Sequence, residues 1–470
     1  MKISHVICRI VVFLLGIELM SGNINGQVVH NRSVRKIILK DLLHESAAGT
    51  DMSEQLRKIL EADSSHVEIV VGDVGCLFLH SLKVPGRVTM TFDNGGSFYA
   101  VDGVKIEIEG EVVAGMYEIF SGPGQISLYR NTKCRVIYPQ WWGAFADGHH
   151  ADDEAIQRAI QSLDQGVITF PPGNYLLSKR IMVPNYLLLQ GSGEQWTRMT
   201  ATSNFADSVM IQVGRDFDHK TGRYDFRHGL AGFEINCSDR VPIAIYSNNL
   251  QELSRIEHLA ILNYTTVGLM LEGFGCQNFK IQDLHIASGN AAVIRERSNI
   301  FIRNIGRGQN TIQNASLVNV KSHFGLAKGR ECNIKIVGSV YSHLSFCNIH
   351  LESSDWGLYN DGCNVTVNNL DSYDVHNTIA LTTSNGGAGF QGIAISQNAG
   401  NVIRNFFVHT ADSVLTTAQT IPFYFFQTKY GLSDPRYFLF HSGRAFEENS
   451  VLDIDANIKT REIQESGKKK

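Results

Sequence analysis

The stretch YPQWWGAFADGHHADDEAIQRAIQSLDQGVITFPPGNYLLS, residues 138–178, contains the most regular pattern of the sequence. Its apolar side chains recur at helical spacing, at Ala155, Ile156, Ala159, Ile160 and Leu163. This spacing predicts an amphipathic helix that starts at Asp152, with Asp152 and Asp153 placed to cap its N-terminus and to complement its dipole. Neighbouring residues at a helix start do not face a common substrate, so we interpret this pair as structural rather than catalytic.

The same stretch resembles the opening signature of pectate-lyase-like β-helix proteins, in which a GA-x-GDG-x-x-DD-x-x-AIQ-x-AI helix leads to a strand that ends in PPG-x-Y. The chain departs from this signature at Ala146, where the family usually has Gly, and at Glu154, where Thr or Ser is common. The pieces IFSGPGQISLYRN, from Ile119, and VPNYLLLQGSG, from Val183, also look like parts of such proteins, and the resemblance extends over residues 67–410.

The resemblance implies an all-β fold, a single-stranded right-handed parallel β-helix (solenoid) with a short amphipathic helix near residue 152. The superfamily includes pectin and glycosaminoglycan lyases, polygalacturonase-like hydrolases, epimerases and phage tail spikes. Its strongest motif is architectural, so the resemblance predicts the fold better than the reaction.

A repeated strand pattern supports a solenoid independently of the family. Seven runs, GFEIN, HLAIL, DLHIA, NVKSH, NIHLE, NLDSY and NFFVH, place an apolar anchor at Phe233, Leu259, Leu284, Val320, Ile349, Leu370 and Phe406. The anchors are 26, 25, 36, 29, 21 and 36 residues apart. Such spacings are typical of solenoid coils, whereas a sandwich shows turn signals about every 8–12 residues.

Side chains alternate along a strand, so the positions one and three residues after each anchor should share the outer face of the solenoid. The first column then reads Glu234, Ala260, His285, Lys321, His350, Asp371 and Phe407. The second column reads Asn236, Leu262, Ala287, His323, Glu352, Tyr373 and His409. Both columns become ionisable from the fourth to the sixth coil, and a register error of one residue would turn these side chains inward.

This cluster matches the needs of β-elimination in a uronate-containing polysaccharide. The reaction requires a base for the proton beside the carboxylate, a proton donor for the departing oxygen and a positive charge for the enolate-like intermediate. We expect the catalytic residues to be Lys321, His323, His350 and Tyr373. Either His350 or Lys321 would be the base, Tyr373 the proton donor, and His323 or Lys321 the neutralising group. A solvated outer face of polar side chains is the alternative for any single one of them.

Substrate-binding residues are expected at Arg303, Arg307, Glu352 and Asp371. The run VIRERSNIFIRNIGRGQN carries the two arginines together with Arg295 and Arg297, and guanidinium groups suit the carboxylate or sulfate groups of an acidic glycan. A neighbouring Glu296 allows a plain surface salt bridge instead.

Three other functions stay open. A polygalacturonase-like hydrolase would need two carboxylates, for which Glu352 and Asp371 qualify, but the coils lack the paired-aspartate and Gly-His-Gly signatures of such hydrolases. A calcium-dependent lyase is conceivable, although no dense Asp/Glu run provides the oxygen ligands. A non-catalytic glycan-binding β-helix is the third, with Trp356 as a possible sugar platform and Trp141 and Trp142 better explained by packing.

Composition and the N-terminus indicate the class and location of the protein. The 42 basic residues face 46 acidic ones, without the basic stripe of a nucleic-acid binder. Lys2 and Arg9 precede an apolar run that is too short to span a membrane, which predicts a signal peptide and a secreted or periplasmic protein. Seven scattered cysteines remain after its removal, and we expect most to be buried apolar residues. Oligomeric state is not predicted by any of these features.

Together these features predict five segments. They are a signal peptide at 1–26, a mixed N-terminal segment at 27–66, a β-rich first part of the solenoid at 67–140, the pectate-lyase-like β-helix at 141–410, and final strands with a C-terminal cap at 411–470.

Overall fold

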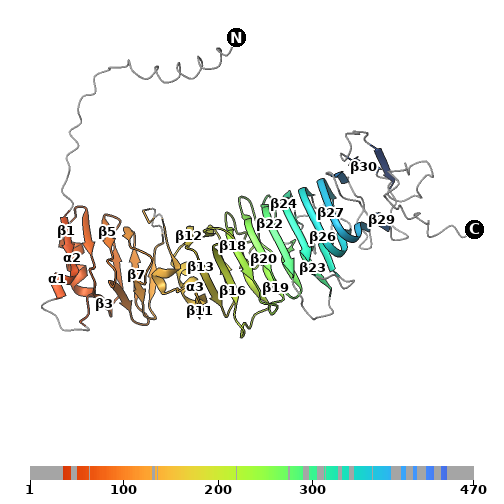
Figure 1. Cartoon of the computed structure of the whole chain (residues 1–470). Coiled ribbons are helices and arrows are strands. Elements are labelled where there is room, and N and C mark those ends of the chain that lie inside the picture. Colours follow the sequence, from red (N-terminus) through yellow and green to blue (C-terminus); the bar gives the residue numbers. More distant parts are fainter. Residues whose placement is uncertain are drawn as a thin grey trace, which may run out of the picture.

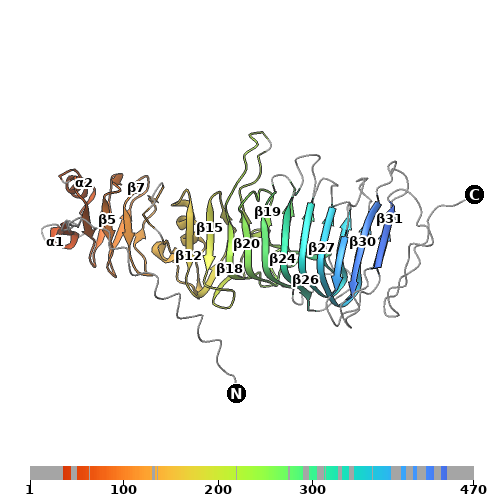
Figure 2. The same cartoon turned by 90° about the horizontal axis from the view of Figure 1, so that it is seen from above.

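The computed structural model shows an elongated rod of stacked coils (Figures 1 and 2). It describes residues 35–43, 50–62, 64–129, 133–134, 136–218, 220–273, 276–288, 296–303, 312, 314–325, 331–337, 343–361, 364–382, 393–397, 406–409, 420–427 and 436–441. Side chains are described through residue 360, except at 343, and then at Val365, Val367, Leu370 and Val375. The signal-peptide prediction and Arg307 lie outside the described residues.

Three small parallel sheets form the N-terminal coils. The first sheet contains β1 (Arg35–Ile38), β2 (Val67–Val70), β5 (Val88–Thr91) and β8 (Glu111–Val113); the second contains β3 (Gly75–Phe78), β6 (Ser97–Ala100) and β9 (Phe120–Ser121); the third contains β4 (Leu82–Val84), β7 (Lys105–Ile108) and β10 (Gln125–Ser127). Helices α1 (Leu39–Leu43) and α2 (Ser53–Ala62) accompany the first strands.

One large parallel sheet winds through the following coils. A 3₁₀ helix at Pro139–Trp142 and α3 (Asp153–Gln161) flank its start, and its strands are β11 (Asp147–Ala151), β12 (Gly166–Phe170), β13 (Gly173–Leu177), β14 (Ile181–Val183), β15 (Leu187–Gly191), β16 (Thr197–Ala201), β17 (Val209–Val213), β18 (Gly229–Asn236), β19 (Ile243–Ser247), β20 (Arg255–Leu262), β21 (Val267–Glu272), β22 (Lys280–Ser288), β23 (Arg297–Arg303), β24 (Ala315–Phe324), β25 (Glu331–Val337), β26 (His343–Asp361), β27 (Asn364–Thr382) and β29 (Phe406–His409). The predicted parallel β-helix is confirmed.

The coils have three faces. The first face contains β12, β15 and the first parts of β18, β20, β22, β24, β26 and β27. The second face contains β11, β13, β16 and the following parts of β18, β20, β22, β24, β26 and β27. The third face contains β14, β17, β19, β21, β23, β25 and the ends of β26 and β27. Left-handed backbone makes the bend between the first and second faces, at Gly232, His258, Asp283, Asn319 and Asn348. Asn, Asp and Gly tolerate this conformation best, which explains their recurrence just before the anchors.

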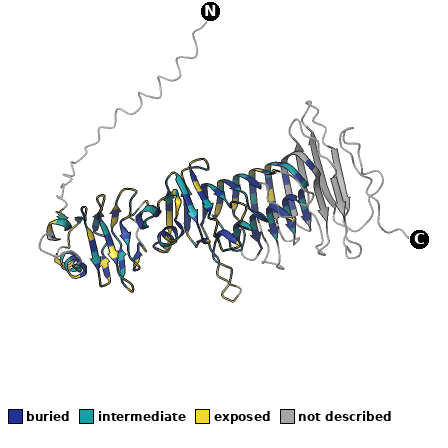
Figure 3. Cartoon of the chain, turned by 60° about the horizontal axis from the view of Figure 1, so that its bottom comes forward, coloured by how far each residue is buried: buried dark blue, intermediate teal, exposed yellow. Residues whose placement is uncertain are grey.

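Apolar ladders fill the interior of the coils (Figure 3). The first six predicted anchors, from Phe233 to Leu370, are each 0–2% exposed and pair with one another in register along the second face. Trp141 and Trp142 are buried, as the packing interpretation predicts. Of the predicted cysteines, Cys76, Cys237, Cys276 and Cys332 are buried as expected.

The seventh anchor is wrong. Phe406 pairs with Ile379 at the end of β27, rather than with Leu370, and therefore belongs to the third face. An alternating pattern indicates which residues point inward, but it does not indicate to which of three faces a strand belongs.

The predicted capping by Asp152 and Asp153 is also wrong in its detail. Helix α3 starts at Asp153, and Asp152, at the N-cap position, makes no side-chain capping bond. The buried Asp152 carboxylate instead accepts hydrogen bonds from the backbone N–H groups of Phe145, Ala146 and Leu176, while Asp153 Oδ1 accepts from the N–H and hydroxyl of Ser178. The pair is structural, because it ties the helix to the turn and strand beside it.

A final sheet of β28 (Ile393–Gln397), β30 (Thr420–Gln427) and β31 (Arg436–His441) contains the antiparallel pair β30–β31. In the described part of the chain, no helix is both long and apolar enough to cross a membrane.

Candidate functional site

The second face carries the two columns of side chains that the sequence predicts. His285, Lys321, His350 and Asp371 pair successively across β22, β24, β26 and β27. Two residues further along the same strands, Ala287, His323, Glu352 and Tyr373 pair in the same way. The intervening Ser322 and Leu351 are fully buried, so the side chains of the two columns on β24 and β26 point outward.

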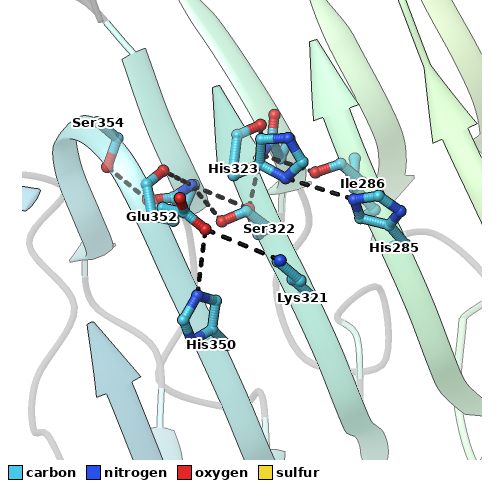
Figure 4. Close-up of polar contacts among 10 residues, drawn as sticks. His285, Ile286, Lys321, Ser322, His323, His350, Glu352 and Ser354 are labelled. Atoms are coloured by element: carbon cyan, nitrogen blue, oxygen red, sulfur yellow. Dashed lines mark hydrogen bonds and ion pairs between the residues drawn. The ribbon is translucent and has the colours of Figure 1, made fainter. Parts of the chain in front are cut away.

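The Glu352 carboxylate links Lys321 and His350 (Figure 4). Its Oε2 atom lies 3.9 Å from Lys321 Nζ and 3.3 Å from His350 Nε2. The Lys321 side chain is 53% exposed, so its ammonium group is open to a ligand in solvent. We call His285, Lys321, His323, His350 and Glu352 the outer-face cluster.

A pair of stacked imidazoles forms the other end of the outer-face cluster. His285 Nε2 lies 3.4 Å from His323 Nδ1, and the ring centroids are 5.1 Å apart. His285 is in the predicted first column but is not among the predicted catalytic residues. Its position in register beside Lys321 was the available signal, because residues on adjacent coils are about 4.8 Å apart.

Both stacked imidazoles favour the neutral form. Burial, followed by the charge of Lys321, holds the pKa of His285 below its ordinary value. Burial and then the neighbouring His285 lower the pKa of His323 in the same way. A neutral imidazole at neutral pH is able to accept a proton.

Buried hydrogen bonds support the strands beneath the cluster. Asn299 and Asn333 each donate from Nδ2 to Ser322 Oγ, at 2.6 and 3.0 Å. The same amide groups donate to the backbone carbonyls of His323 and Glu352, at 3.1 and 3.2 Å. Satisfied polar networks of this kind make a site rigid, so the backbone under His323 and Glu352 is well fixed.

The other predicted site residues have different outcomes. Asp371 and Tyr373 have backbones in register with His350 and Glu352, but their side chains, like the whole of Arg307, lie outside the described residues. Arg303 is on the third face, where it forms an ion pair with Glu272. The structure therefore does not bring Arg303 to the outer-face cluster.

Arg297 of the arginine-rich run does not face solvent. Arg297 is buried and forms an ion pair with Glu331 at 3.0 Å, and Arg295 lies outside the described residues. Nor do the described residues contain a group of three or more His, Cys, Asp or Glu side chains that could hold a metal ion.

A right-handed parallel β-helix with an ionisable patch on one outer face defines the class of this protein. The sequence profile of the family described as "Rhamnogalacturonase A/epimerase, pectate lyase-like" matches residues 141–404, and the chain belongs to this family. The family description does not distinguish a lyase from a hydrolase or an epimerase.

Several solved structures are similar to this chain at low sequence identity. They include ORF18 of Geobacillus virus E2 (16% identity, 66% of this chain and 65% of that chain, TM-score 0.41), the gp42 tailspike of Acinetobacter phage vb_AbaP_AS12 (12%, 68% and 67%, 0.39) and the A-module of the Azotobacter vinelandii mannuronan C-5 epimerase AlgE4 (13%, 63% and 100%, 0.30). The chain thus spans just under two thirds of the first of these proteins. No curated protein matches the sequence.

Proposed function

We propose that this chain is an exported lyase that cleaves a uronate-containing polysaccharide by β-elimination on its second face. The observation that carries the proposal is the juxtaposition, two residues apart on the outer side of β24, of the exposed Lys321 ammonium group and the neutral-favouring His323 imidazole. Glu352 is the one carboxylate among the described outward side chains of the two columns on β22, β24 and β26, and Lys321 and His350 already lie against it. A double-carboxylate hydrolysis is therefore less well supported by the described side chains.

The geometry suggests one revision of the roles expected from the sequence. A group that neutralises an enolate must be positive, and the lowered pKa of His323 disfavours its cationic form. We therefore assign the neutralising role to Lys321 and the role of base to His323, with His285 as the residue that positions it. His350 orients Glu352, and Tyr373, whose backbone pairs with that of Glu352, is the proton donor.

The proposed reaction consumes no water. The base takes the proton from the carbon that bears the uronate carboxylate, and the electron pair left behind is stabilised as an enolate facing Lys321. The enolate then expels the glycosidic oxygen on the next carbon, and that oxygen takes a proton from Tyr373. One product ends in an ordinary sugar hydroxyl, and the other ends in a ring with a carbon–carbon double bond conjugated to the carboxylate.

The test is to incubate the protein with polygalacturonate, rhamnogalacturonan and glycosaminoglycans and to follow ultraviolet absorbance of the unsaturated ring. We expect absorbance and new reducing ends to rise together with at least one polymer. Reducing ends without absorbance would mean hydrolysis, and hydrogen exchange with solvent at the uronate carbon without cleavage would mean epimerisation. Tyr373→Phe should lower turnover by about 10²- to 10⁴-fold, the usual contribution of a general acid.

A further inference from the structure

The two most exposed aromatic side chains described in the structure each lie just before a strand of the second face. Trp196 is 66% exposed and Phe145 is 64% exposed. Asp147, Asn174 and Arg198 pair in register across β11, β13 and β16. Phe145 is two residues before Asp147, and Trp196 is two residues before Arg198. The strands β11 and β16 that follow them are two strand spacings, roughly 10 Å, apart along the axis of the solenoid.

Both aromatic side chains have a close neighbour although they face solvent. The Phe145 ring stacks on His150 with a centroid distance of 4.5 Å, and the Nδ1 atom of His150 lies 2.7 Å from Asp147 Oδ2. The indole of Trp196 folds over Gly193, where a Cβ atom would stand 3.4 Å from its Cδ1 atom. Exposing an aromatic ring forgoes the stabilisation of burial, and fixing it in advance reduces the entropy lost when a ligand binds.

The first column of outward positions connects the strand that follows Trp196 to the outer-face cluster. From β16 the first column continues through Arg198, Glu234 and Ala260 to His285. Ala260 and Ala287 are small and nearly flush with the strands, so they allow a flat ligand to approach closely. From β16 to β24 the path covers four strand spacings, roughly 19 Å, which several linked sugar rings would span.

The turn that carries Trp196 also reaches toward the cluster electrostatically. The carboxylate of Glu194, two residues before Trp196, acts on His285 and opposes part of the lowering of its pKa by burial and by Lys321. The register from Arg198 through Glu234 and Ala260 to His285 joins the strand that follows Trp196 to the outer-face cluster.

We propose that Trp196 and Phe145 are aromatic platforms for sugar rings at the far end of an extended glycan-binding surface, along which the polysaccharide runs parallel to the axis of the solenoid. Sugar rings have an apolar face that packs on aromatic side chains, and the linear path joins these platforms to Lys321. This inference rests on the proposed function for the identity of the ligand as a polysaccharide, but it does not depend on which reaction the cluster performs.

The test measures binding without turnover. Affinity electrophoresis in gels containing polygalacturonate or rhamnogalacturonan would compare the wild type with Trp196→Ala and Phe145→Ala, using Tyr99→Ala as the matched control. Tyr99 is an exposed aromatic residue of β6 in the N-terminal coils. Each platform variant should bind the polymer about 3- to 10-fold more weakly, as expected for the loss of one aromatic contact, while the control binds like the wild type.

Ligand length provides the second readout. The loss should persist with long oligosaccharides and disappear with disaccharides, which occupy the cluster but do not reach the platforms. Equal binding of the polymer by the wild type and both platform variants would overturn the inference, as would the absence of polysaccharide binding by the wild type. Binding that depends on Trp196 without formation of any unsaturated product would support the platforms and refute only the lyase reaction.

Discussion

His285 Nε2 lies 3.4 Å from His323 Nδ1, so these two imidazoles on adjacent coils act as one unit. One nitrogen must donate and the other accept when both rings are neutral. This arrangement restricts the tautomer of His323 and keeps its ring stacked at a fixed orientation. It also means that protonation of either ring disfavours protonation of the other.

The pair predicts a specific pH dependence of turnover. A base must be deprotonated, so kcat/KM should rise with pH through the pKa of His323, which is held below the ordinary value of about 6.5. In His285→Ala, burial of His323 decreases and the charge repulsion disappears, so the pKa of His323 should rise. The acidic limb of the pH–rate profile then moves to higher pH.

His258→Ala is the control for this shift, because His258 is an exposed histidine at the bend before the second face and interacts with Asp283. Its profile should superimpose on that of the wild type. An unchanged acidic limb in His285→Ala would contradict the role of His323 as the base.

Lys321 provides the second prediction, which concerns charge. Lys321→Ala should lower kcat by about 10²- to 10³-fold, because a preorganised positive group facing the enolate is lost. Lys321→Arg should recover part of the rate, since it keeps the charge but changes its geometry. Lys335→Ala on the third face is the matched control and should keep the wild-type rate. A fully active Lys321→Ala enzyme would remove the main support for elimination.

The positions of the site residues could be predicted from the sequence because a parallel coil converts spacing into contact. Once Val320 and Ile349 are identified as stacked anchors, Lys321 must pair with His350 and His323 with Glu352. The conformation of the turns is not needed for this inference, because the anchor residue of each strand sets the register of that strand.

Other features depend on contacts that spacing does not encode. Phe406 follows the alternating pattern, but its predicted position on the second face is wrong. The residues that connect the coils determine on which face the next strand lies. Arg297 looks like a surface cation in the sequence and is buried because Glu331 occupies the paired position on the next coil. Asp152 hydrogen-bonds to Leu176, 24 residues later, and no local capping rule anticipates that contact.

The third prediction concerns a buried histidine far from the outer-face cluster. Burial lowers the pKa of His228 to about 4, from 6.5. The unfolded chain therefore binds this proton more readily than the folded protein, so stability is complete above pH 6.5 and is lost as the pH falls toward 4. The loss should approach roughly 3 kcal/mol, on the order of 1.4 kcal/mol for each pKa unit.

Thermal unfolding between pH 7 and pH 4 would measure this effect. His228→Gln should be less stable than the wild type at neutral pH, because a buried side chain is replaced, but its melting temperature should fall less steeply with acidification. For each protein, the fall in melting temperature with pH is measured relative to the melting temperature of that same protein at neutral pH. Parallel slopes would show that other groups dominate acid unfolding.

The fourth prediction concerns the contribution of the buried Arg297–Glu331 ion pair to stability. Arg297 and Glu331 are 2–3% exposed, and Arg297 also donates to Ser288 Oγ at 2.9 Å and lies over the ring of Phe324 at 5.3 Å. Glu331→Gln leaves the guanidinium buried without its counter-charge, so we expect a loss of about 3–5 kcal/mol in unfolding free energy. The double variant Arg297→Met with Glu331→Leu removes both charges and should be more stable than Glu331→Gln, because apolar side chains avoid the cost of desolvating ions. Chemical denaturation of the wild type and the two variants would give the order of their unfolding free energies. A double variant less stable than Glu331→Gln would indicate that the ion pair itself stabilises this coil, and that the cost of an isolated charge is the smaller effect.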